Sequence, residues 1–256
     1  MACRAQALAA QALAAQALAA LALAALALVL AGCSAVPRGP NALPSTFIPS
    51  VSPSSSAAPA EIGGFTALER EALRVRVRTC SEYGTGSAFA VDAHHAITNR
   101  HVAEGATDIT LTGFDGTVYQ GTSAVLSRSA DLALITIKGT FPNIASFASA
   151  EPELGDILTI AGYPKGEALA TREGPFNGHV PDTLQTNVDA VYEIDAESHP
   201  GNSGSAVANT AGDIEGVLYA SNDVDISYAV GLPAVQEFLS TLDKAQKNSA
   251  QCKAQG

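Results

Sequence analysis

The sequence predicts an all-β domain of the sandwich or barrel type that ends in one helix and follows an N-terminal signal and a tether. Three observations lead to this prediction. The composition changes sharply along the 256 residues, short apolar runs recur between turn residues, and only one segment has the spacing of an amphipathic helix. The net charge of −11 makes a partner bound through phosphate contacts unfavourable, so we expect no nucleic-acid ligand.

Residues 1–33 are predicted to be a lipoprotein signal peptide. The stretch from Ala5 to Ala31 carries no charge and follows a single basic residue, Arg4. It ends in Leu-Ala-Gly-Cys at 30–33, which resembles the lipobox of bacterial lipoproteins. The resemblance implies that the Cys33 thiol takes a diacylglycerol and that cleavage leaves Cys33 at the mature N-terminus.

Two alternatives for this segment stay open. A run of 27 residues at about 1.5 Å per residue could span a bilayer uncleaved, and an ordinary signal would release a soluble protein. All three interpretations place the rest of the chain outside the cytoplasm. The lipobox favours an exported protein that is lipid-anchored on the outer face of the bacterial cytoplasmic membrane, with secretion as the alternative.

Residues 34–62 are predicted to be a flexible tether. The part from 34 to 60 contains six prolines and seven serines but a single aromatic residue, Phe47. Such a stretch cannot bury a core, and its prolines favour extended polyproline II structure. The folded domain is therefore expected at 63–256.

Within this domain the strands are short and numerous. Leu73, Val75 and Val77 alternate with three arginines, which is the pattern of a half-buried strand. Further apolar runs lie at 87–91, 96–98, 108–112, 117–126, 132–137, 156–162, 187–194, 213–220 and 226–230. Near the end of the chain, Pro233 suits a first helical position and is followed by apolar residues at helical spacing.

Three separated segments carry residues suited to nucleophilic catalysis. The segments 96–106, 127–139 and 196–207 place His101, Asp131 and Ser203 in the order His–Asp–Ser. A serine hydroxyl needs an adjacent base, and histidine has the pKa for that task. A buried carboxylate fixes the histidine tautomer, and a tight glycine-rich loop can present backbone N–H groups to an oxyanion.

The chain order distinguishes between the known arrangements of such triads. The α/β-hydrolases run Ser–Asp–His and the subtilisins run Asp–His–Ser. The segments ITNRHVAEGA (97–106), DLALITI (131–137) and HPGNSGSAV (199–207) resemble the trypsin-like serine proteases, on the HtrA/DegP side of that clan. The resemblance spans about 80–240 and is nearest to extracytoplasmic actinobacterial members.

The resemblance implies a chymotrypsin-like fold of two antiparallel six-stranded β-barrels with a C-terminal helix. It assigns His101 as general base, Asp131 as the residue that orients it, and Ser203 as nucleophile. The N–H groups of Gly201 and Ser203 become the oxyanion-hole donors. Ser-Ala at 205–206 departs from the usual Gly-Pro of the family, and the PDZ domain found in many HtrA proteins is not expected.

The remaining candidates concern specificity, crosslinks and metals. Glu197 lies six positions before Ser203, where trypsin-like enzymes that cut after basic residues carry an acid, so it is a possible S1 specificity residue. Small apolar P1 side chains are the alternative preference. The cysteines of the predicted folded domain are Cys80 and Cys252. In an oxidising compartment we expect them to form a disulfide, and two unpaired thiols are the alternative.

We expect neither a metal nor a cofactor, because the five histidines match no zinc motif. The sequence thus predicts an extracytoplasmic serine endopeptidase that forms an acyl-enzyme with protein or peptide substrates. The alternative is a catalytically silent protease fold that binds partners at the cell surface. The sequence does not indicate an oligomeric state.

Overall fold

The computed structural model describes residues 63–182, 188–222, 224–249 and 252. The predicted signal peptide (1–33), with its lipobox cysteine Cys33, and the tether (34–62) lie outside the described residues. Within the described part of the chain, no helix is long and apolar enough to cross a membrane.

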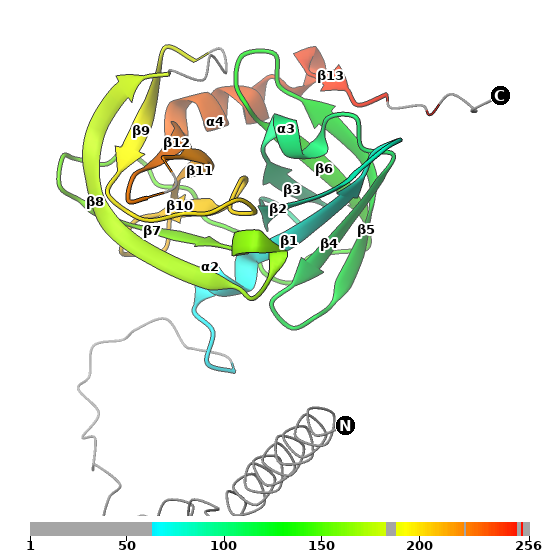
Figure 1. Cartoon of the computed structure of the whole chain (residues 1–256), viewed down its shortest axis with the longest axis horizontal. Coiled ribbons are helices and arrows are strands. Elements are labelled where there is room, and N and C mark those ends of the chain that lie inside the picture. Colours follow the sequence, from blue (N-terminus) through cyan, green and yellow to red (C-terminus); the bar gives the residue numbers. More distant parts are fainter. Residues whose placement is uncertain (1–62, 183–187, 223, 250–251, 253–256) are drawn as a thin grey trace, which may run out of the picture. The chain divides into compact units, whose positions relative to one another are not determined.

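The first half of the domain forms a closed antiparallel barrel (Figure 1). Its strands, in chain order, are β1 (Ala72–Arg78), β2 (Tyr83–Ala90), β3 (His95–Thr98), β4 (Asp108–Gly113), β5 (Val118–Leu126) and β6 (Ala133–Lys138). The strand order is β5-β4-β1-β2-β3-β6, and pairing of β5 with β6 closes the barrel. In β1 the alternation predicted from the sequence is real, because Val75 and Val77 are buried while the arginines between and after them turn outward.

The second half forms another closed antiparallel barrel. Its strands are β7 (Ile157–Gly162), β8 (Ala170–Pro181), β9 (Ala190–Ile194), β10 (Ala206–Ala208), β11 (Ile214–Ser221) and β12 (Ser227–Gly231). They close in the order β10-β11-β12-β9-β8-β7. The predicted fold of two six-stranded antiparallel barrels is therefore confirmed.

Helices are few and short. The described helices are α2 (Ala67–Glu71), α3 (Arg100–Ala103) and α4 (Leu232–Ser240), with 3-10 turns η1 (Pro164–Gly166) and η2 (Leu242–Lys244). The predicted C-terminal helix is confirmed as α4, whose Leu232, Val235 and Phe238 are buried against the second barrel. A capping box between Thr66 and Glu69 fixes the start of α2.

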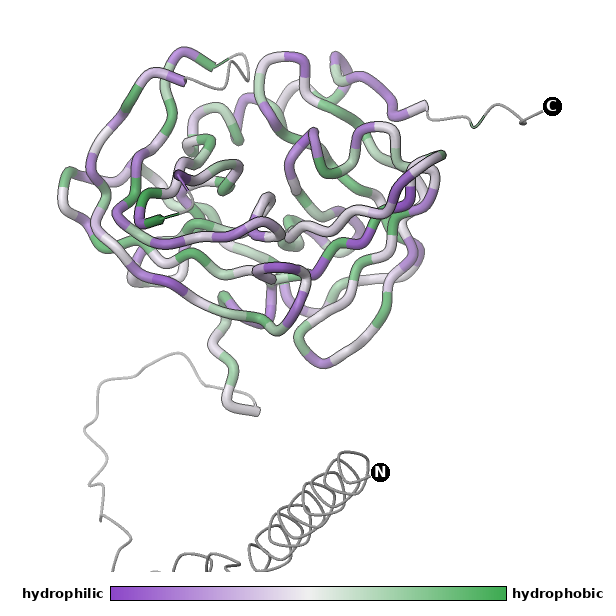
Figure 2. Tube along the Cα trace, in the orientation of Figure 1, coloured by the Kyte–Doolittle hydropathy of each residue, from purple (hydrophilic) through white to green (hydrophobic). Residues whose placement is uncertain are grey.

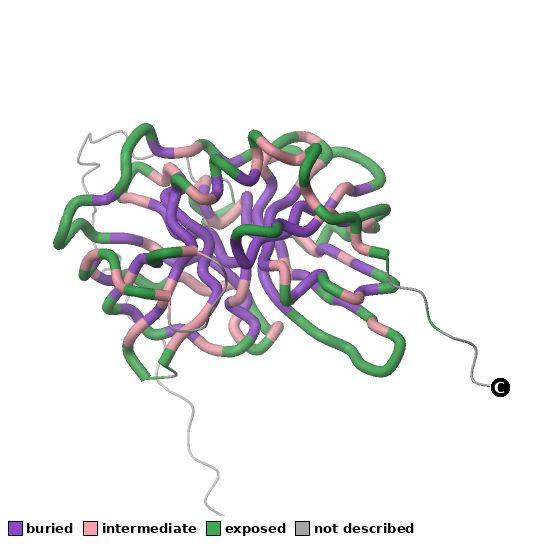
Figure 3. Tube along the Cα trace, turned by 90° about the horizontal axis from the view of Figure 1, so that it is seen from above, coloured by how far each residue is buried: buried purple, intermediate pink, exposed green. Residues whose placement is uncertain are grey.

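The two barrels share an apolar core at their junction. Phe89 and Leu132 from the first barrel belong to the same buried cluster as Val217 and Phe238 from the second half. Buried segments gather in the interior of the domain and exposed segments at its periphery (Figure 3), while polar and apolar residues alternate along much of the trace (Figure 2). Truncation of a fully buried residue such as Leu132 to alanine is expected to cost about 2–5 kcal/mol, so the junction holds the barrels in one arrangement.

The chain returns from the second barrel to the first after α4. Strand β13 (Gln246–Lys247) pairs with β5, and the side chain of Asn248 donates to the carbonyl of Ala106. The predicted disulfide is present: Cys80 and Cys252 are bonded, with their Cα atoms 5.3 Å apart and a sequence separation of 172 residues. The last described residues are thus fixed to the barrel that the chain forms first.

Two strands of the second barrel were missed in the sequence. Strand β8 contains two glycines and two prolines, residues that are typical of turns, yet it pairs with both β7 and β9. Strand β10 has three residues and gives too short a pattern to detect. The run predicted from 187 to 194 begins as a strand at Ala190, and residue 187 lies outside the described residues.

Candidate active site

His101 lies in a short helix at the end of the first barrel that faces the second. Helix α3 follows β3 directly and buries Val102 and Ala103, which leaves the side chain of His101 about half exposed. The side chain of the buried Asn99, just before α3, donates to the backbone carbonyl of Asp131 at 2.8 Å. This bond fixes the segment that carries His101 against the segment that carries Asp131.

The carboxylate of Asp131 is buried and holds His101 through two contacts. Its Oδ2 lies 2.6 Å from Nδ1 of His101, and its Oδ1 accepts the backbone N–H of His101 at 2.9 Å. Because a carboxylate only accepts hydrogen bonds, Nδ1 carries a proton, and in the neutral imidazole Nε2 therefore keeps the lone pair. His101 is therefore held in the tautomer that a general base requires.

The register of the first barrel explains how these residues meet. Strand β3 pairs with β6, with Thr98 opposite Ala133, so the residues just after β3 lie beside those just before β6. Ahead of Asp131, the hydroxyl of Ser127 accepts the N–H groups of Ser129 and Ala130 and closes a tight turn. This turn directs the Asp131 side chain toward α3.

Ser203 lies in the loop between β9 and β10, and this loop contacts strand β2 of the first barrel. Its backbone carbonyl accepts the N–H of Ser87 at 2.7 Å. A Cβ placed on the neighbouring Gly86 would lie 3.1 Å from that carbonyl and 2.9 Å from two methyl groups of Val102. Gly86 therefore separates the Ser203 loop from α3 by the thickness of one backbone.

No hydrogen bond joins the Ser203 hydroxyl to His101 in the described part of the chain. Such contacts are often long in serine enzymes without substrate and shorten when substrate binds. The structure thus brings Asp131 and His101 into direct contact, and Ser203 O lies close to Gly86, which also packs beside Val102 of α3.

Two backbone N–H groups in the Ser203 loop have no partner among the described residues. The N–H groups of Asn202, Gly204 and Ser205 donate to carbonyls at 2.8–2.9 Å, whereas those of Gly201 and Ser203 donate to none. Gly201 and Gly204 have φ values of +99° and +88°, which other residues rarely adopt. The loop geometry therefore leaves two donors free at the predicted oxyanion hole.

Three hydrogen bonds from outside the loop fix its carbonyl groups. The N–H of Lys165 donates to Pro200 O at 2.6 Å, the hydroxyl of Ser87 donates to Gly201 O at 2.8 Å, and the N–H of Ser87 donates to Ser203 O. Because a trans peptide directs its N–H opposite to its carbonyl, the bond to Pro200 turns the N–H of Gly201 away from Lys165. Ser87 is fully buried and also accepts the N–H of Tyr163 at 2.9 Å.

The turn at Tyr163–Gly166 packs directly against this loop. Lys165 has a φ of +57° and is the one non-glycine residue with positive φ in the described chain, a conformation that costs about 1–2 kcal/mol. A Cβ on Gly201 would lie 2.6 Å from the N atom of Lys165. Gly201 is therefore required for both its conformation and its close approach to the turn.

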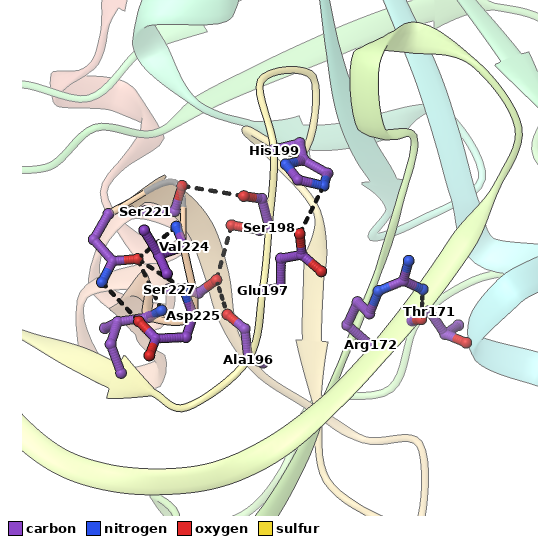
Figure 4. A network of polar contacts seen from close by, with 12 residues as sticks. Thr171, Arg172, Ala196, Glu197, Ser198, His199, Ser221, Val224, Asp225 and Ser227 are labelled. Carbon is purple, nitrogen blue, oxygen red and sulfur yellow. Dashed lines mark hydrogen bonds and ion pairs between the residues drawn. The ribbon is translucent and has the colours of Figure 1, made fainter.

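A cavity of about 270 Å³ opens beside Ser203. Its lining consists of Ser198, His199, Pro200, Asn202, Ser203, Leu218, Ala220 and Ser221. Glu197, the predicted specificity residue, is not in this lining: its carboxylate pairs with Nε2 of His199 at 3.1 Å and its side chain is 48% exposed. In Figure 4 the carboxylate of Glu197 and the hydroxyl of Ser198 point to opposite sides of their segment.

Sequence reasoning missed Ser87 and Lys165, whose hydrogen bonds shape the loop. Ser87 stands at the start of a predicted strand, and nothing in an alternating pattern shows that a strand serine will contact a loop more than 100 residues away. The Tyr-Pro-Lys-Gly sequence at 163–166 does signal a turn, but its partner follows only from the fold.

The chain is similar in sequence to known serine peptidases. The sequence profile of the family described as "Trypsin-like peptidase domain" matches residues 84–217, just over half of the chain. "Serine protease Do-like HtrB" of Bacillus subtilis is 33% identical over 144 residues, which are 52% of this chain and 31% of that protein. "Serine protease Do-like HtrA" of the same organism is 30% identical over 189 residues, 63% of this chain and 40% of that protein.

Solved structures show the same fold. The active form of the Rv3671c protease of M. tuberculosis superposes with a TM-score of 0.63 at 21% identity, over 74% of this chain and 86% of that one. A serine endoprotease of Yersinia pestis gives a TM-score of 0.60 at 22% identity, over 69% of this chain and 65% of that one. The chain matches less than half the length of the two Bacillus relatives.

Two closed barrels with a His–Asp contact and a glycine-rich serine loop between them define a chymotrypsin-like serine peptidase fold. The chain belongs to the family of trypsin-like peptidase domains. Its relatives in the comparisons include HtrA- and DegP-type serine proteases.

Proposed function

We propose that the chain is a serine endopeptidase that uses Ser203 as nucleophile, His101 as general base and Asp131 as the residue that orients His101. The observation that carries this proposal is the double contact of Asp131 with His101, which leaves Nε2 of the imidazole free to accept a proton. The unpartnered N–H groups of Gly201 and Ser203 supply the second requirement, a place for a negatively charged oxygen.

The reaction then follows from these positions. Ser203 Oγ attacks the carbonyl carbon of a peptide bond while His101 Nε2 takes its proton, and the buried Asp131 stabilises the imidazolium. The N–H groups of Gly201 and Ser203 donate to the oxyanion. His101 returns the proton to the leaving amine, and water hydrolyses the acyl-enzyme by the same route in reverse.

The cavity beside Ser203 is the proposed site for the side chain that precedes the cleaved bond. Its lining includes Ser203 and the β11 residues Leu218 and Ala220. Since Glu197 lies outside this lining and is paired with His199, a role in selecting basic side chains is not favoured by its position. A Glu197→Ala variant assayed on matched Arg and Val peptides tests the remaining prediction.

A fluorophosphonate probe tests the proposed activity. It reacts with a serine only when the base and the oxyanion donors are in place, so we expect labelling of the wild type at Ser203. Ser203→Ala should remove labelling and peptide hydrolysis while the thermal unfolding midpoint stays near that of the wild type. A folded wild type that neither labels nor cleaves would support the alternative, a silent protease fold that binds partners.

We also propose that the protein is exported and anchored through a lipid on Cys33. The supporting observations are the Leu-Ala-Gly-Cys ending at 30–33, the disulfide between Cys80 and Cys252, and a relative from Chlamydia pneumoniae named "Probable periplasmic serine endoprotease DegP-like". Mass spectrometry of the protein from its native host should show a lipidated N-terminal Cys33. An unmodified Cys33 inside a retained segment 1–33 would contradict this.

A further inference from the structure

Helix α3, which carries His101, is too short to be stable without outside contacts. It has four residues, and Asn99 at its start makes no side-chain capping bond to it. After its last residues the chain turns at Gly105, whose φ is +75°. The N–H of Gly105 donates to Oδ1 of Asn248 at 3.2 Å. The helix that holds the proposed general base is therefore capped by a side chain from the far end of the domain.

The side-chain amide of Asn248 pairs with two backbone groups of this turn. Besides accepting the N–H of Gly105, it donates from Nδ2 to the carbonyl oxygen of Ala106 at 2.9 Å. The opposite orientation of the amide would set two acceptors and two donors against each other, so the partners fix the orientation. The backbone of Asn248 is itself held, because its N–H donates to the carbonyl of Ala124 in β5 at 2.9 Å.

The segment around Asn248 also contacts the turn that leads to Asp131. We call residues 244–248 the C-terminal strap; it includes β13, which pairs with β5. Nε of Arg128, three positions before Asp131, donates to the carbonyl oxygen of Lys244 at 3.2 Å. The strap thus contacts both segments of the first barrel that bring His101 and Asp131 together.

We propose that Asn248 is a positioning residue for the general base: by holding the end of α3 it fixes the imidazole of His101 against the carboxylate of Asp131. This inference rests on the proposed endopeptidase function. The strap lies outside residues 84–217, which match the trypsin-like peptidase domain, and none of its residues lines the cavity beside Ser203. A change at Asn248 should therefore impair proton transfer and spare the binding of the P1 side chain.

The kinetics of fluorophosphonate labelling of the full-length protein separate positioning from stability. Asn248→Ala removes both bonds to the turn, so the labelling rate constant and kcat should each fall about 10-fold while KM stays within about 2-fold of the wild type. The labelling amplitude should remain that of the wild type, because every folded molecule keeps its nucleophile. A loss of folded protein alone would lower the amplitude and leave the rate constant unchanged, and this result would overturn the inference.

Asn209→Ala is the matched control. The amide of Asn209 also ties a turn, since Oδ1 accepts two backbone N–H groups between β10 and β11 and Nδ2 donates to Glu215. This variant should lose stability and keep the wild-type labelling rate constant.

A near-isosteric variant covers the case in which Asn248→Ala does not fold. Asn248→Asp keeps the shape of the side chain and an acceptor for Gly105, but it turns a second acceptor toward the carbonyl of Ala106. It should therefore also label about 10-fold more slowly than the wild type, with full amplitude.

The outcomes distinguish the inference from the proposed function. A wild type that neither labels nor cleaves overturns the proposed function and the inference with it. A wild type that labels, with folded Asn248 variants that label at the same rate constant, overturns the positioning role alone. Equal slowing by Asn209→Ala would trace the effect to general destabilisation and would also overturn that role.

Discussion

Asp131 offers the sharpest test of the catalytic assignment, because both of its carboxylate oxygens accept hydrogen bonds from the same residue. Oδ1 accepts the backbone N–H of His101 at 2.9 Å and Oδ2 faces Nδ1 at 2.6 Å. Asp131→Asn preserves the shape of the side chain but leaves only one acceptor oxygen. One of the two contacts must therefore become a contact between two donors.

The imidazole is the partner that can adapt. The backbone N–H cannot move its proton, so the amide oxygen should stay with it and the NH₂ group should face Nδ1 of His101. The ring proton then shifts to Nε2, and His101 can no longer accept the proton of Ser203. A wrong tautomer of this kind lowers kcat by about 10⁴, which is about 5.5 kcal/mol in the activation free energy.

The assay is the steady-state hydrolysis of a peptide together with the rate of fluorophosphonate labelling. Both should fall by about the same factor, while the unfolding midpoint changes little. Asp92→Asn is a matched control, because Asp92 contacts Nδ1 of His95 at 2.8 Å at the surface of the first barrel. It should leave kcat unchanged. If Asp131→Asn retained kcat within 10-fold of the wild type, the assignment of Asp131 would be refuted.

Three further variants test the supporting structure. Replacing both Cys80 and Cys252 by serine should lower the free energy of unfolding by about 5 kcal/mol in the chain-entropy model for a 172-residue separation, measured by denaturant unfolding; an unchanged midpoint would show that the crosslink does not constrain the unfolded chain. Ser87→Ala should lower kcat about 10-fold with little change in KM, because Gly201 O loses its donor and the oxyanion loop loosens; a change in KM alone would contradict this. Burial raises the pKa of Glu71 from 4.5 to about 7, with Asp213 adding to the effect and Arg70 opposing it, so the folded state favours the protonated form. Stability should therefore fall by about 3 kcal/mol as the pH rises from about 4.5 to 7, and Glu71→Gln should remove this fall in unfolding experiments across that range; equal slopes for variant and wild type would refute it.

Most of the first barrel could be predicted from the sequence, because the burial of its strands follows their local residue pattern. In β1 and β6 the apolar positions follow the burial pattern, and the runs are bounded by turn residues. Strand β8 was not predicted because its glycines and prolines disfavour a strand locally. It forms because it pairs with a strand on each side, which is a property of the closed sheet. Local propensity cannot anticipate such tertiary support.

The candidate active site likewise has a part that could be predicted from the sequence and a part that could not. His101, Asp131 and Ser203 could be selected from their local motifs, since each lies in a segment with its own signature. The orientation of the oxyanion loop could not, because it depends on Ser87 and Lys165, which reach it across the junction of the barrels. Glu197 shows the limit of counting along the chain. Its position relative to Ser203 suggested the pocket, but its side chain points away from that of its neighbour Ser198, which lines the cavity instead.

The pairing of β13 with β5 has a consequence for the order in which the protein can mature. A chain that emerges from its N-terminus presents β5 and Cys80 long before Gln246 and Cys252 follow. The first barrel can therefore collapse early, but its outermost strand and its crosslink wait until the second barrel and α4 have been synthesised. Oxidation of Cys80 should accordingly be a late event, and the fraction of oxidised chains would report how many molecules have brought both barrels together.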